Sequence, residues 1–274
     1  MGDPTAPREH IAFLVRSDAR IDILTRLFES GPATQRELRT ELDSSRSTVA
    51  RSLSALEECG WVERHADGHR LTPVGTLVAE GFLDFVETLR AAEDLSPFLE
   101  WFPLAEYDLE IDQLEGAAIT PSTPGDPYKP GRAQTEFMRS TSRFRAFLPS
   151  TELEGTKLLH ERVTNGDLEA ELIVSPAVER TIESASFAPL YREQLRTDRM
   201  AVFVSDEPLP FYLGIDDDWT IQLGVEDDEG FPRALLETAE PSVAEWATEL
   251  YREYRSNARR KPSAAFEDRL AGDR

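Results

Sequence analysis

Residues 34–70 read TQRELRTELDSSRSTVARSLSALEECGWVERHADGHR, and this stretch predicts two short helices followed by a hairpin. Thr34 and Glu37 have the spacing of a capping box at the start of the first helix. The polar turn at 43–45 offers side-chain oxygens that can cap the second helix. Apolar residues at 49, 53 and 56 would lie on the buried side of that helix. The stretch therefore indicates a helix-turn-helix.

The outward face of the second helix has the composition of a DNA-recognition helix. It combines arginines and hydroxyl side chains with small residues that allow close approach to a major groove. We expect Arg46, Ser47 and Arg51 to lie nearest the bases, and Gln35 and Arg36 to contact phosphate. The expected DNA-binding residues of the two helices are Gln35, Arg36, Ser45, Arg46, Ser47, Thr48 and Arg51.

The hairpin after the second helix reads as the wing of a winged helix. Residues 61–64 are interpreted as a short strand, and an Asp-Gly pair between short strands is a strong hairpin signal. Four basic side chains surround the expected tip, where they would reach flanking backbone or the minor groove: Arg64, His65, His69 and Arg70.

A long apolar helix is expected to follow the wing, because Thr72 and Pro73 have the pattern of a helix start. Its apolar stripe needs a partner, and we favour the same helix of a second subunit over the chain's own second domain. The candidate dimerisation residues are Val74, Leu77, Val78, Phe82, Phe85 and Leu89.

The charge of the chain is extreme for a DNA-binding protein. Its 274 residues carry a formal net charge of -22, and only three of them are lysines. This composition resembles that of proteins from salt-accumulating halophilic archaea, where molar salt screens surface charge within about 3 Å. Residues 1–90 carry 15 acidic and 11 basic residues, so this part is far less acidic than the remainder. The asymmetry supports placing DNA on the N-terminal part.

The remaining compositional signals predict a soluble, cytoplasmic protein. The single cysteine, Cys59, excludes an intramolecular disulfide and fits a reducing compartment. No signal peptide is apparent, and no apolar run approaches the roughly 20 residues of a membrane span.

The C-terminal part predicts a layered α/β domain. Strand-like runs at 144–148, 172–174 and 200–204 alternate with helical stretches at 152–164 and 177–196, the second broken near Pro189, which implies parallel strands. Runs at 211–215 and 219–225 read as an antiparallel hairpin, and a last helix begins at Pro241. Residues 118–132 read as a loop. We expect an α+β protein with a winged helix-turn-helix at 8–72, linker or dimerisation helices at 73–103, and an α/β effector or sensor domain with a mostly parallel sheet at 104–260.

Two stretches resemble a known group of proteins. SRSTVARSLSALEECGWVER followed by RLTPVG is similar to the N-terminal domain of haloarchaeal winged-helix transcriptional regulators. The C-terminal half, closing with PSVAEWATELYREYRSNAR, resembles the methanogenesis-regulator middle domain and, more loosely, the TrmB-type sensor. The resemblance implies a domain like half of a phospholipase D fold that senses a ligand or mediates dimerisation.

An enzyme and a metal centre are both disfavoured by the sequence. Phospholipase D chemistry needs a histidine and a lysine two residues apart on a strand, whereas His160 is followed by Glu161-Arg162 within an expected helix. Cys59, His65 and His69 lack the spacing of a structural zinc site. The acidic runs at 216–218 and 226–229 lack calcium-loop spacing and are interpreted as solvated surface. We expect no catalytic residues, metal or cofactor.

A small effector would bind at the carboxyl ends of the parallel strands, where crevices open. Hydroxyl side chains follow each strand there, which suits an anionic or sugar-like ligand, although plain capping of the helices that follow is the favoured explanation. The ligand candidates are Ser150, Thr151, Ser175 and Ser205.

Two functions remain open from the sequence. The first is a dimeric, sequence-specific regulator that binds double-stranded DNA. The alternative is a protein-interaction adaptor that keeps the winged-helix fold without contacting DNA. The surface potential around the second helix distinguishes them, because DNA requires a neutral-to-positive stripe.

Overall fold

The computed structural model describes residues 6–266, which divide into two compact units with a boundary between Arg90 and Ala91. Each unit is described by itself. Within the described residues, no helix combines the length and apolar character needed to cross a bilayer.

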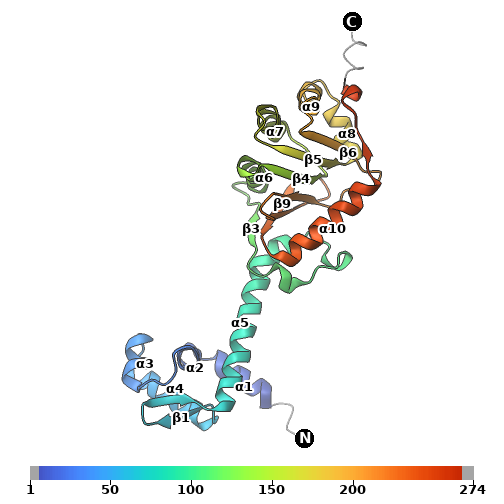
Figure 1. Cartoon of the computed structure of the whole chain (residues 1–274). Coiled ribbons are helices and arrows are strands. Elements are labelled where there is room, and N and C mark those ends of the chain that lie inside the picture. Colours follow the sequence, from blue (N-terminus) through green and yellow to red (C-terminus); the bar gives the residue numbers. More distant parts are fainter. Residues whose placement is uncertain (1–5, 267–274) are drawn as a thin grey trace. The chain divides into compact units, whose positions relative to one another are not determined.

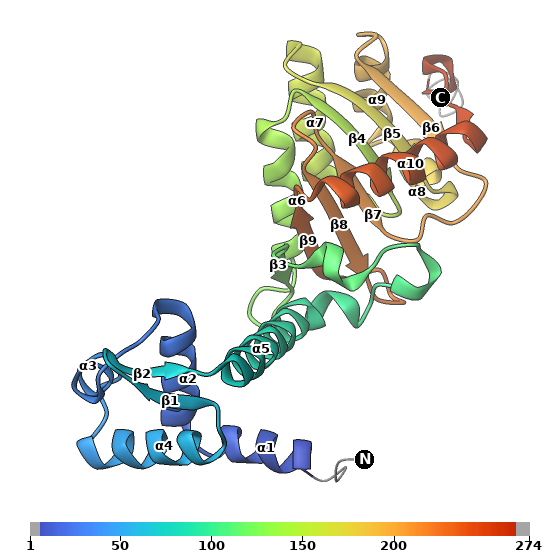
Figure 2. The same ribbon diagram turned by 60° about the horizontal axis from the view of Figure 1, so that its bottom comes forward.

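The N-terminal unit is a helical core with a two-stranded hairpin (Figures 1 and 2). Its core is formed by apolar residues from each helix and from the hairpin, including Ile23, Leu38, Val49 and Leu56, all fully buried. Its elements are α1 (Ala6–Val15), α2 (Asp18–Ser30), α3 (Gln35–Glu41), α4 (Arg46–Glu58), β1 (Val62–His65), β2 (Gly68–Leu71) and the first part of α5 (Pro73–Leu99). This is the expected helix-turn-helix with a wing.

The hairpin is fixed to the helices by a short backbone pairing. Ala33, just before α3, forms an antiparallel bridge with His69, with N–O distances of 3.0 and 2.8 Å. Gly68 makes this approach possible: its φ is +124°, and a Cβ atom there would lie 2.4 Å from the Ala33 carbonyl oxygen. The wing is therefore held beside the start of α3.

The C-terminal unit is built on an eight-stranded mixed sheet of order β10-β6-β5-β4-β7-β8-β9-β3. Only the β4–β5 and β5–β6 pairs are parallel, and the other five pairs are antiparallel. The strands are β3 (Ala118–Pro121), β4 (Arg143–Leu148), β5 (Glu169–Val174), β6 (Met200–Val204), β7 (Tyr212–Ile215), β8 (Ile221–Glu226), β9 (Pro232–Thr238) and β10 (Arg259–Arg260).

Alternating side chains give this sheet two buried faces. On β4, Phe144 and Ala146 belong to one core and Phe147 belongs to the other. The face of Phe144 is covered by α6, α7 and α9, and the opposite face by α10 (Figures 1 and 2). The remaining elements are η1 (Leu104–Glu106), η2 (Ile111–Leu114), α6 (Lys129–Ser140), α7 (Leu153–Asn165), α8 (Pro176–Ile182), α9 (Ala188–Leu195), α10 (Pro241–Asn257) and η3 (Ser263–Phe266).

The α+β class is confirmed, but the expectation of a mostly parallel sheet is wrong in detail. The central strands are parallel as expected, and the β7–β8 hairpin is antiparallel as expected. Strands β3, β9 and β10 were not expected, and all three add antiparallel pairs. The helical stretch at 177–196, expected to break near Pro189, is indeed two helices, α8 and α9, and the break lies just before Pro189. Helix α6 begins inside the expected 118–132 loop.

The two acidic runs also differ from the expected solvated surface. The Asp217 carboxylate accepts hydrogen bonds from the Thr141 hydroxyl at 2.6 Å and from the Ser142 hydroxyl at 2.5 Å. Asp227 accepts from the backbone amides of Glu229 and Phe231. These carboxylates hold the turns between strands, so part of the acidity has a structural role.

Candidate functional site

The turn between α3 and α4 is set by side-chain caps. Thr34 and Glu37 form both hydrogen bonds of a capping box at the start of α3. The Ser45 hydroxyl accepts from the Thr48 amide at 3.1 Å, so Ser45 is the N-cap of α4. The Thr48 hydroxyl lies 2.8 Å from that of Ser45 and is thereby engaged within the cap. Of the hydroxyl residues expected at DNA, Ser45 and Ser47 are exposed and Thr48 is half-buried, and the Ser47 hydroxyl lies 3.0 Å from that of Ser45.

Exposed arginines lie on both helices of the motif. Arg36 is on α3, and Arg46 and Arg51 are on α4. Within residues 6–266, none of these three guanidinium groups forms a salt bridge or hydrogen bond. Gln35, expected at phosphate, is half-buried, and its side-chain amide donates to the Arg46 carbonyl at 3.4 Å, which joins the starts of the two helices. Arg39 of α3 is likewise exposed, and its guanidinium forms no salt bridge or hydrogen bond with the described residues. It was not predicted from the sequence as a DNA-binding residue.

The four basic residues of the wing differ, because each has an acidic neighbour. Arg70 lies 2.7 Å from Glu63, and Arg64 lies 3.3 Å from Glu57. His65 lies 3.3 Å from the Asp67 carboxylate. The side chain of His69 is only 15% exposed, and its Nε2 lies 3.3 Å from Glu57. The charge of the wing is therefore largely compensated within the unit, whereas that of the α3–α4 face is not.

The apolar stripe expected on α5 splits into two groups. Val78 and Phe82 are half-buried and contact the core of the N-terminal unit. The others project away from that core with large exposed fractions: Val74 58%, Leu77 70%, Phe85 55% and Leu89 48%. The residues expected to dimerise thus include two that stabilise the unit itself.

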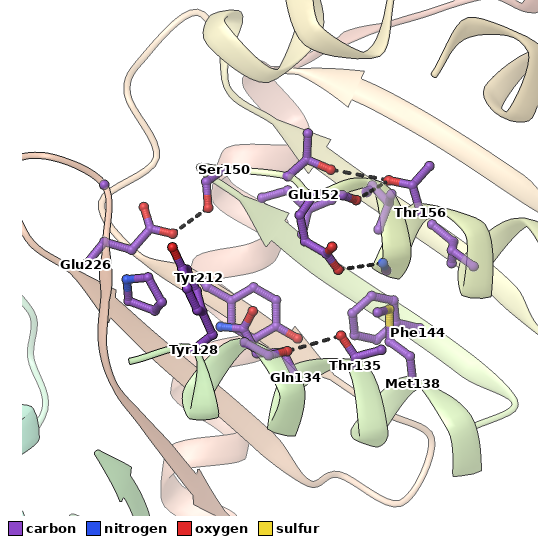
Figure 3. A pocket seen from close by; sticks show the side chains of 18 of the residues that line it. Tyr128, Gln134, Thr135, Met138, Phe144, Ser150, Glu152, Thr156, Tyr212 and Glu226 are labelled. Atoms are coloured by element: carbon purple, nitrogen blue, oxygen red, sulfur yellow. Dashed lines mark hydrogen bonds between the residues drawn. The ribbon is translucent and has the colours of Figure 1, made fainter. Parts of the chain in front are cut away.

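A cavity of about 290 Å³ opens on the Phe144 face of the sheet in the C-terminal unit (Figure 3). It is lined by residues of α6, α7, α9 and strands β4, β5, β7 and β8, and by the segments next to them. Ser150 and Thr151, where the chain leaves β4, line it as the strand-end argument suggested. Ser175 and Ser205 do not line it. The Ser175 hydroxyl caps α8, and that of Ser205 accepts from the Glu207 amide at 3.2 Å.

Several lining residues were not identified from the sequence. Tyr128, Glu152, Tyr212 and Glu226 come from four separate segments and meet only in the fold (Figure 3). Glu226 is half-buried, and the Ser150 hydroxyl donates a hydrogen bond to its carboxylate. Burial raises the pKa of Glu226, and this outweighs the opposing effect of Ser150. The Glu152 carboxylate accepts from the Glu154 and Gly155 amides and so caps α7.

The histidine of the C-terminal unit is not placed as phospholipase D chemistry would require. His160 lies on α7 rather than on a strand, its Nε2 is 2.8 Å from Glu193, and it does not line the cavity. Residues 6–266 bring together no group of three or more His, Cys, Asp or Glu side chains suited to a metal ion. Cys59 is half-buried at the end of α4, and burial raises the pKa of its thiol.

Each unit contains a region that matches a known protein-domain family. Residues 8–94 match the HVO_A0261 N-terminal domain, and residues 127–257 match the middle domain of the methanogenesis regulatory protein FilR1. No curated protein matches the sequence.

Three solved structures illustrate the distant similarities. TrmBL2, an archaeal chromatin protein, is 12% identical with a TM-score of 0.40, over 92% of this chain and 99% of its own. Nuc from Salmonella typhimurium, a phospholipase D family member, is 12% identical with a TM-score of 0.42, over 53% of this chain and 99% of its own. The regulator Tm0710 from Thermotoga maritima is 25% identical with a TM-score of 0.23, over 34% and 75%. The chain therefore contains a region that matches the HVO_A0261 N-terminal domain, followed by a region that matches the FilR1 middle domain.

Proposed function

We propose that the protein is a dimeric transcription regulator that binds double-stranded DNA through α3, α4 and the wing, and a small effector through the cavity of its C-terminal unit. The FilR1 domain is named for a regulatory protein, and the N-terminal unit has the helix-turn-helix architecture that reads a major groove. In this proposal no catalytic step is assigned to the chain, because the cavity contains neither the histidine nor the lysine of phospholipase D chemistry.

One observation carries the DNA-binding part of the proposal. Arg36, Arg46 and Arg51 are exposed on adjacent helices and have no acidic partner within the described residues, in a chain with a net charge of -22. An unpaired guanidinium is free to form the bidentate hydrogen bonds that phosphates and guanine edges accept. In the proposed complex Arg46, Ser47 and Arg51 face the bases, and Arg36 contacts phosphate.

The wing contributes less in this proposal. Arg64 and Arg70 must exchange a carboxylate partner for a phosphate, so the net gain of each contact is smaller. The side chain of His69 is mostly buried beside Glu57, which leaves His65 with the two arginines as the wing contacts.

The dimer in this proposal is formed by the exposed stripe of α5. Val74, Leu77, Phe85 and Leu89 recur at helical spacing, and large apolar side chains this exposed on one helix face are typical of an interaction surface. Two-fold pairing of the same stripe would present two recognition helices to a palindromic operator.

Chromatin occupancy mapping in the source organism, followed by mobility shift on the enriched fragments, tests the function. We expect discrete promoter-proximal peaks that share an inverted repeat, and a shift at the salt concentration of the cell. Occupancy without a shared sequence, combined with no shift of purified protein, would instead support the adaptor without DNA contact.

A further inference from the structure

The lining of the cavity has an unusual charge. It contains two carboxylates, Glu152 and Glu226, and no lysine, arginine or histidine. Glu152 is neutralised locally, because it caps the N-terminal amides of α7. Those amides are consequently unavailable to an anionic ligand, and the charge of the lining disfavours the anionic effector that the sequence suggested.

Glu226 differs from Glu152 because no cation compensates it. Its hydrogen-bond partner is the neutral Ser150 hydroxyl, and no salt bridge reaches it within the described residues. The nearby Arg233 is engaged by Asp227, at 2.6 Å. Burial makes the charged form of Glu226 costly, which is the direction of its raised pKa. A bound cation would remove this cost.

Aromatic side chains form much of the remaining wall. Tyr128, Tyr212 and Phe144 line the cavity together with Glu226 (Figure 3). Aromatic faces attract organic cations through the ring quadrupole, an interaction that gains strength when water is excluded. Tyr212 is only 5% exposed, so its ring is largely shielded from solvent.

A buried hydroxyl in the lining also lacks a well-formed partner. Tyr191 is fully buried, and its hydroxyl makes no hydrogen bond of good geometry, although those of Thr156 and Thr151 lie close to it. Burial raises its pKa to about 12, so the group is a neutral donor and acceptor at physiological pH. Buried polar groups normally find a partner, and a ligand in the cavity could supply one.

We propose that this cavity binds a small organic ammonium ion, with Glu226 as the counter-charge and Tyr128 and Tyr212 as the aromatic wall. The volume of about 290 Å³ lies at the lower end of ligand pockets, which limits the occupant to a few carbon atoms around the charged nitrogen. This inference rests on the proposed effector function and names its ligand class.

Calorimetric titration of the full chain in molar potassium chloride tests the ligand class. The probes are choline, its neutral isostere 3,3-dimethylbutan-1-ol, glucose and acetate. We expect choline to bind at least tenfold more tightly than the isostere, and glucose and acetate to bind more weakly still. Equal binding of choline and its isostere, tighter binding of glucose or acetate, or no binding of choline would overturn the proposal.

Variants test the residue roles. Glu226→Gln should weaken choline binding at least tenfold and remove the preference over the isostere, whereas Glu229→Gln, exposed in the turn after β8 and not among the lining residues, should change neither. Tyr128→Ala alters an exposed residue at the cavity, so it should fold normally and weaken choline several-fold. Unchanged binding by Glu226→Gln would contradict the counter-charge role.

The outcome is separable from that of the proposed function. DNA binding is measured on the same protein by mobility shift, with none of the small-molecule ligands present. Selective choline binding by a protein that does not bind DNA would keep the ligand assignment and refute the regulator. DNA binding without choline binding would refute only the ligand assignment.

Discussion

The two units of this chain use their charges in opposite ways. In the N-terminal unit the arginines of α3 and α4 project without partners, although the chain as a whole is strongly acidic. In the C-terminal unit many cations are paired, as Lys261 is with Glu179 and Glu183, and an uncompensated carboxylate faces a cavity. In each unit the candidate ligand surface contains a charged group without a counter-charge, and the two surfaces call for ligands of opposite sign.

Lys261 provides the largest expected effect on stability. It is 3% exposed, and its Nζ lies 2.7 Å from Glu179 and 2.6 Å from Glu183. Burial raises the pKa of Glu179, but hydrogen bonds from Lys261 and Arg259 outweigh this and lower it. We expect Lys261→Met to reduce the free energy of unfolding by about 3 kcal/mol, because two carboxylates lose their buried counter-charge.

Chemical denaturation at constant high salt measures this loss. The matched variant is Arg46→Met, which removes an exposed, unpaired cation and should change the unfolding free energy by less than about 0.5 kcal/mol. Equal losses of unfolding free energy in the two variants would show that pairing does not distinguish Lys261 from Arg46.

The exposed stripe of α5 gives the next effect. Leu77→Glu with Phe85→Glu should convert the proposed dimer into a monomer, since two charges per helix would have to be buried at the interface. Light scattering reports the molar mass. The control is Thr76→Glu, which adds a charge to an exposed position on a different face of the same helix and should leave the dimer intact. A wild-type protein of one-chain mass would refute the dimer at the outset.

Asp217 predicts a smaller effect that depends on pH. Hydrogen bonds from Ser142 and Thr141 hold its pKa well below the ordinary value of 3.8. Its contribution is therefore present above the unfolded-state pKa and is lost as pH falls through the folded-state value. Because the residue is exposed, Asp217→Asn should cost only about 1 kcal/mol at pH 7.

Denaturation curves at pH 7 and pH 3 check this dependence. The difference between wild type and Asp217→Asn should shrink at the lower pH. Asp228→Asn, exposed in the second acidic run, is the control and should have no effect at either pH. A cost for Asp217→Asn that is the same at both pH values would mean that its charge is not what stabilises the turn.

The wing sharpens the comparison within the N-terminal unit. Arg70→Ala should weaken DNA binding by no more than about threefold, because the wild-type side chain must first leave Glu63. Arg51→Ala should weaken it by at least about tenfold, which corresponds to the 1–3 kcal/mol of a base-reading arginine. Fluorescence anisotropy on one operator compares the two directly. A larger loss for Arg70→Ala would place the wing, rather than α4, at the specific contact.

Local signals in the sequence were sufficient for the N-terminal unit. The capping box of Thr34 and Glu37 and the Asp-Gly hairpin are each fixed by near neighbours in the chain, and the structure contains both. The same applies to the alternating helices and strands around β4, β5 and β6, because their apolar runs are long.

Features that depend on contacts between residues far apart in the sequence could not be predicted from local signals. Strand β3 ends at Pro121 within a stretch rich in proline and glycine, and β10 has two residues, so only their pairing with β9 and β6 defines them. The cavity shows the same limit. Ser150 follows from the strand-end rule, but Tyr128 and Glu226 are brought beside it by the mixed sheet, which the expectation of mostly parallel strands did not contain.

The central claim is that the unpaired arginines of α3 and α4 contact DNA. The salt dependence of operator affinity tests it most directly, since each phosphate contact contributes about 0.9 to the slope of log K against log salt. We predict that Arg36→Ala, Arg46→Ala and Arg51→Ala combined will lower both the affinity and this slope, whereas Arg139→Ala with Arg180→Ala, exposed positions on α6 and α8, will leave both unchanged. If the wild type and the triple variant had the same affinity and the same slope of log K against log salt, the account would be contradicted.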